Sequence, residues 1–70
     1  MNVLNQEIQA LQYTIVFHQN YLERFENAIM YADLTLTEKR EYQKRIEYHQ
    51  QQIKKAAEEL NIRLNEAKDL

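Results

Sequence analysis

The sequence predicts an all-α protein, an antiparallel two-helix hairpin with a coiled-coil-like seam that dimerises into a four-helix bundle. The 70 residues include no Gly and no Pro, which favours long uninterrupted helices over tight turns and sheets. Apolar residues recur at alternating steps of three and four in both halves of the chain, a spacing typical of helices packed lengthwise. The two apolar stripes align in pairs whose residue numbers sum to about 67 or 68, which indicates one antiparallel hairpin spanning residues 1–70.

The first helix is expected at about residues 2–31. Asn2 can act as its N-cap, because an Asn side chain accepts a backbone N–H at a helix start. The expected seam residues of this helix are Leu4, Ile8, Leu11, Ile15, His18, Leu22, Phe25 and Ile29.

The turn is expected at about residues 32–37. Thr35 and Glu38 have the spacing of a capping box. Thr37 is a second candidate N-cap, so the second helix is expected to begin at Leu36 or at Glu38. Leu34 and Leu36 are expected to fold back over the end of the seam.

The second helix is expected at about residues 38–67. Its seam residues are Tyr42, Ile46, His49, Ile53, Ala56, Leu60 and Leu64. In the antiparallel alignment Phe25 meets Tyr42, His18 meets His49 and Leu4 meets Leu64.

The two helices differ in the width of their apolar surface. The second helix has a narrow apolar arc, whereas the first helix continues its arc around one flank to roughly 200°. We call this flank of the first helix the aromatic flank; it consists of Val3, Ala10, Tyr13, Phe17, Tyr21, Ala28 and Tyr31. An exposed apolar surface of this kind marks an interaction site. The flank is expected to pack on a second copy of the chain or to bind a partner protein; scattered surface tyrosines are the plainer alternative.

The only histidines, His18 and His49, are expected to form one polar layer of the seam. Imidazole is a frequent metal ligand, but the di-iron bundle pattern requires Glu three residues before each His. Ile15 and Ile46 occupy those positions. The sequence therefore predicts no metal site, and it predicts a polar layer that fixes the register of the helices.

No enzyme, cofactor or small-molecule substrate is expected, because Ser, Cys and Gly-rich phosphate loops are absent from the sequence. The formal net charge of −2 provides no bulk attraction to nucleic acid or anionic membranes. No apolar run is long enough to span a bilayer. The absence of Cys favours a cytoplasmic location.

A basic stripe on the second helix suggests nucleic-acid binding as an alternative, since such a stripe can follow phosphates. It consists of Arg40, Lys44, Gln51 and Lys55, with Lys54 and Tyr48 at its edges. Glu47 and Glu58 interrupt it. A dimer of two-helix hairpins resembles Rop, a small RNA-binding four-helix bundle, in architecture alone.

The function expected from these observations is that of a small non-enzymatic protein-interaction module. A regulator or inhibitor of the phage or mobile-element type is the favoured class, acting on a partner protein through the first helix. A Rop-like nucleic-acid-binding bundle and a structural assembly subunit are the alternatives. Fold alone does not decide among them.

Overall fold

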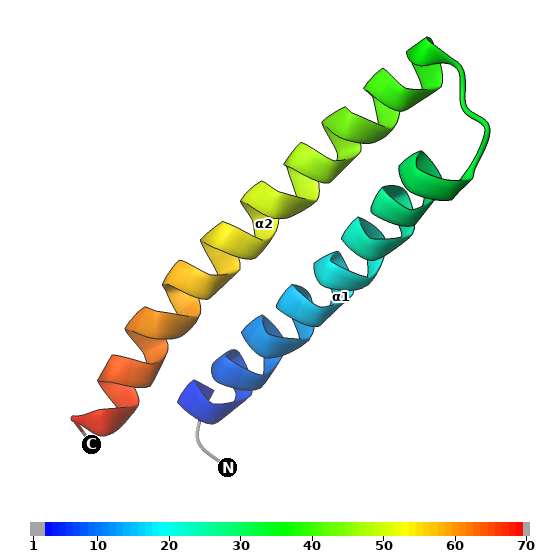
Figure 1. The fold of residues 1–70 in the computed structure, drawn as a ribbon. Helices are drawn as coiled ribbons and strands as arrows, with labels where there is room; N and C mark the ends of the chain where they lie inside the picture. Colours follow the sequence, from blue (N-terminus) through cyan, green and yellow to red (C-terminus); the bar gives the residue numbers. More distant parts are fainter. Residues whose placement is uncertain (1–2, 70) are drawn as a thin grey trace.

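The computed structural model describes residues 3–69 and consists of two antiparallel helices (Figure 1). Helix α1 spans Val3–Tyr31 and helix α2 spans Leu36–Lys68. They lie side by side in a rod of 52 × 17 × 13 Å. The start of α1 and the end of α2 share one end of the rod, which we call the open end. The predicted all-α hairpin is confirmed; the predicted N-cap, Asn2, lies outside the described residues.

The capping box predicted at the turn is present. The Thr35 hydroxyl accepts a hydrogen bond from the Glu38 backbone N–H at 3.2 Å, and the Glu38 carboxylate accepts one from the Thr35 N–H at 3.2 Å. Thr35 is therefore the N-cap, and α2 begins at Leu36 with Thr37 inside its first turn. The predicted range of about 38–67 for this helix therefore begins two residues too late, and of the two starts considered Leu36 is the correct one. Leu34 is half-buried as expected, but Leu36 is 64% exposed and does not cover the seam.

Two contacts between rings of opposite helices confirm the predicted register of α1 and α2 at their own positions. His18 and His49 lie opposite each other with their Nδ1 atoms 2.7 Å apart. One layer nearer the turn, the ring centroids of Phe25 and Tyr42 are 5.5 Å apart. The alternating heptad steps therefore place these two layers as the antiparallel alignment predicts.

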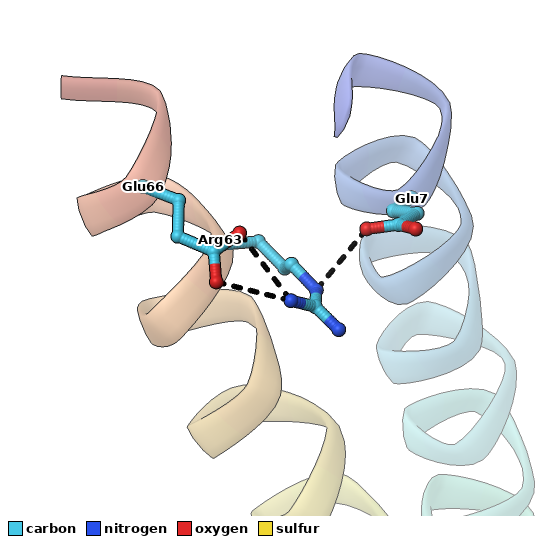
Figure 2. A network of polar contacts seen from close by, with 3 residues as sticks. All are labelled: Glu7, Arg63 and Glu66. Carbon is cyan, nitrogen blue, oxygen red and sulfur yellow. Dashed lines mark hydrogen bonds and ion pairs between the residues drawn. The ribbon is translucent and has the colours of Figure 1, made fainter. Parts of the chain in front are cut away.

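At the open end a polar contact lies beside Leu64, the residue predicted to pair with Leu4. Leu64 is 40% exposed, whereas Arg63 is half-buried. Arg63 Nε lies 3.1 Å from a carboxylate oxygen of Glu7 on α1, and its Nη1 donates to both oxygens of Glu66 at 3.1 and 3.3 Å (Figure 2). The strict heptad step from the preceding layers leads to position 63, so the Arg63 side chain also lies along this end of the seam.

The hairpin buries few side chains completely. Among residues 3–69, the only buried side chains are Ala56, at 6% exposure, and His18, at 9%. The chain exposes 5687 Å², whereas a compact protein of 8.5 kDa exposes about 4,700 Å². A single seam between two helices is open to solvent on both sides, so the isolated hairpin leaves about 1,000 Å² more surface exposed than a compact protein does.

Candidate protein-interaction face

The histidine layer is surrounded by aromatic rings from both helices. Tyr21 stacks on His49, with ring centroids 5.3 Å apart and an interplanar angle of 5°. Phe17 meets His18 edge-on at 5.3 Å, and Tyr48 meets His49 edge-on at 5.2 Å. Edge-on and offset-stacked arrangements are those that aromatic rings favour. The layer is thus one connected set of rings.

Three of these rings also reach the surface. Phe17 is 46% exposed, Tyr21 is 37% exposed and Tyr48 is 55% exposed. Phe17 and Tyr21 lie one helical turn apart, and their ring centroids are 5.0 Å apart. We call the surface made by the aromatic flank of α1 together with Tyr48 of α2 the aromatic face.

Tyr48 was not predicted to belong to this surface, since the sequence pattern places it at the edge of the basic stripe. Its ring centroid lies 6.2 Å from that of His18 on the opposite helix. A helical-wheel count places Tyr48 on the same side of α2 as Arg63, and Arg63 pairs with Glu7 beside the aromatic flank. Tyr48 therefore adds an α2 residue to a face that the sequence assigns to the first helix alone.

Two guanidinium groups lie against rings of this region. Arg24 Cζ is 5.7 Å from the centroid of Tyr21, and Arg45 Cζ is 5.7 Å from the centroids of both Phe25 and Tyr42. Such cation–π contacts contribute about 0.5–1 kcal/mol at exposed sites. They hold positive charge beside the rings.

The remaining members of the aromatic flank lie along the rest of α1. Val3, Tyr13 and Tyr31 are 66%, 74% and 80% exposed. Ala10 is exposed and its carbonyl accepts a hydrogen bond from the Thr14 hydroxyl, whereas Ala28 is half-buried. The structure thus brings Phe17 and Tyr21 into ring contact, and it spaces the other flank residues over a helix about 43 Å long.

The two imidazoles share one Nδ1–Nδ1 hydrogen bond, in which one ring donates and the other accepts. Burial, and after it the nearby charge of His18, lowers the pKa of His49 below 6.5. Within residues 3–69 no hydrogen bond or ion pair joins either imidazole to a carboxylate. The same part of the chain holds no group of three or more metal-ligating side chains.

The residues of the basic stripe lie on the outer surface of α2. Arg40, Lys54 and Lys55 are exposed, and Lys44 Nζ lies 3.7 Å from a carboxylate oxygen of Glu41. Gln51, Lys54, Lys55 and Glu58 line a shallow hollow. Carboxylates therefore lie among the basic groups of this stripe, so within residues 3–69 it is not a purely cationic surface.

A second apolar surface lies near the turn and was not predicted. It is an open groove of about 380 Å³ lined by Glu26, Ile29, Met30, Gln43 and Ile46. Met30, which is 70% exposed, lies outside the aromatic flank on the helical wheel. Neither helix, over the described residues, combines the length and apolarity needed to cross a membrane.

Comparison with known proteins gives no match, since no family model fits the chain and no curated protein or solved structure is significantly similar to it.

Proposed function

We propose that this protein is a small non-enzymatic interaction module that dimerises through its aromatic face into a four-helix bundle. The regulators and inhibitors that act by binding a partner protein are the proposed functional class, and the cytoplasm is the proposed location. The observation that carries the proposal is the cluster of exposed rings formed by Phe17, Tyr21 and Tyr48 over the histidine layer. Large aromatic side chains at the centre of a surface are the usual energetic anchors of protein interfaces.

The exposed area of the chain supports a second copy as the occupant of this face. Two separate hairpins would expose twice 5687 Å², whereas a compact assembly of about 17 kDa exposes about 7,700 Å². The difference is about 3,700 Å², which lies within the range of about 2,000–5,000 Å² buried by obligate homodimers. A dimer therefore supplies the burial that the thin interior of one hairpin lacks.

The composition of the face supports the same arrangement. Along the aromatic flank the rings of Tyr13, Phe17 and Tyr21 lie between the small side chains of Ala10 and Ala28, and small residues allow another helix to approach closely. Tyr48 extends the ring cluster onto α2, so both helices of one copy contribute to the contact with the other copy.

The test compares two double variants with the parent chain. Phe17→Glu with Tyr21→Lys places opposite charges at the centre of the aromatic face, and it should convert the dimer to a poorly helical monomer because buried charges are costly. Gln50→Lys with Gln51→Glu is the matched control, since both glutamines are exposed and the net charge is likewise unchanged.

The measurement is sedimentation equilibrium, with helicity followed by circular dichroism on dilution. The proposal requires a dimeric parent and control and a monomeric face variant. A parent that is monomeric and fully helical at micromolar concentration would overturn the dimer. A face variant that stays dimeric would show that association uses another surface.

A further inference from the structure

We propose that the His18–His49 pair makes this dimer proton-sensitive, so that the dimer forms when the pair is neutral and dissociates when both imidazoles are protonated. The inference depends on the dimer proposed above and adds the regulation of that same face. It follows from the geometry of the pair and from the rings that lie against it.

The short distance between the two imidazoles permits only some of their protonation states. The Nδ1 atoms are 2.7 Å apart, which leaves room for a single hydrogen between them. A neutral pair satisfies this geometry, because one Nδ1–H donates to the lone pair of the other Nδ1. A pair carrying one extra proton also satisfies it. When both rings are protonated, two N–H donors and two positive charges face each other, so the rings must separate.

Separation of the pair would disturb the aromatic face directly. The ring of His49 stacks on Tyr21 and packs edge-on against Tyr48, and the ring of His18 packs edge-on against Phe17. These three aromatic side chains are the exposed centre of the proposed interface. A displaced imidazole therefore moves the rings that contact the second copy.

The surroundings offer the doubly protonated pair no compensating charge. From α1 the pair is faced by the phenol of Tyr21, over which Arg24 lies. From α2 it is faced by the phenol of Tyr48, and Arg45 lies over the neighbouring rings one layer away. In the part of the chain that the structure describes, no carboxylate hydrogen-bonds or ion-pairs with either ring. Arg24 and Arg45 are themselves cationic, so neither supplies a compensating negative charge.

The sign of the pH effect follows from linkage. Burial and the nearby His18 charge hold the pKa of His49 below 6.5 in the folded chain, and covering the face in a dimer increases that burial. The separated or unfolded chain therefore binds more protons than the dimer does. Association is complete above about pH 6.5 and weakens as pH falls below it. Suppose that dimerisation lowers the pKa of one histidine in each chain by one unit. At a pH below both pKa values, the dimer dissociation constant then rises by about tenfold for each chain, or about a hundredfold for the dimer.

The experiment measures the dimer dissociation constant at about pH 7.5 and about pH 5.5, on either side of the ordinary histidine pKa. For the parent chain we expect a rise of at least about tenfold at the lower pH. In the variant His18→Leu with His49→Leu the constant should be the same at both pH values. The single variant His49→Gln retains a hydrogen-bonding side chain and allows only one protonation, so it should lose most of the dependence even if the double variant folds poorly.

The possible outcomes separate the two proposals. A parent that is monomeric at the higher pH would overturn the dimer itself. A dimeric parent whose dissociation constant is equal at both pH values would leave the dimer intact and overturn its proton sensitivity. An equal rise in the parent and in both histidine variants would assign the effect to carboxylates and would likewise overturn the inference.

Discussion

Replacement of Thr35 with Ala should destabilise the hairpin by about 1 kcal/mol. The change removes the hydroxyl that accepts the Glu38 N–H, whereas the backbone N–H of residue 35, which donates to the Glu38 carboxylate, remains. Loss of a Thr N-cap costs about 0.5–2 kcal/mol. Both bonds are 3.2 Å long and exposed, so the middle of that range applies. For a chain of this size, about 1 kcal/mol corresponds to a drop in Tm of about 4–8 °C.

Thr37→Ala is the matched control for this prediction. Thr37 lies inside the first turn of α2 and does not cap it, and Ala has a slightly higher helix propensity than Thr. The control should therefore melt at the same temperature as the parent or slightly above it. Thermal and urea unfolding followed by circular dichroism measure both variants, at one fixed protein concentration because association shifts the Tm. Equal losses in the two variants, or no loss in Thr35→Ala, would refute the cap assignment.

Two further changes test the packing of the seam by urea unfolding. Ala56→Leu should cost about 1–3 kcal/mol, because Ala56 is 6% exposed and a larger side chain pushes the helices apart; Ala57→Leu at the adjacent exposed position should change stability by less than about 0.5 kcal/mol. Arg63→Leu should leave stability unchanged or raise it by up to about 1 kcal/mol, since exposed ion pairs contribute little and a half-buried leucine gains apolar contact. A loss above about 2 kcal/mol would show that the ion pairs of Arg63 stabilise the open end.

The sequence predicts the register of this hairpin because residues at seam positions must alternate by three and four, and only one antiparallel alignment joins the two stripes. The histidine layer and the contact of Phe25 with Tyr42 follow from that alignment alone. The capping box is also readable, since its two residues interact locally and need no tertiary contact.

The sequence predicts less well where polarity and periodicity disagree. At the open end apolarity favours Leu64, whereas the heptad step leads to Arg63. The long aliphatic part of an arginine can line a seam while its charged end reaches solvent. The position of Tyr48 depends on which side of α2 turns toward the aromatic flank. The sequence contains this information, because Tyr48 directly precedes His49 as Phe17 directly precedes His18. Equivalent positions of two antiparallel right-handed helices lie on the same face of the pair. Apolar periodicity considered one helix at a time misses this signal.

The antiparallel pairing also determines how the chain can fold. Phe25 and Tyr42 close a loop of only about 17 residues, whereas Glu7 and Arg63 close one of about 56, which costs about 1 kcal/mol more in chain entropy. Layers near the turn can therefore form first. The remaining layers then form in order toward the open end, and each loses little additional chain entropy. A change at the Thr35 cap should alter mainly the folding rate, and a change at Arg63 mainly the unfolding rate, a contrast that chevron kinetics measure directly.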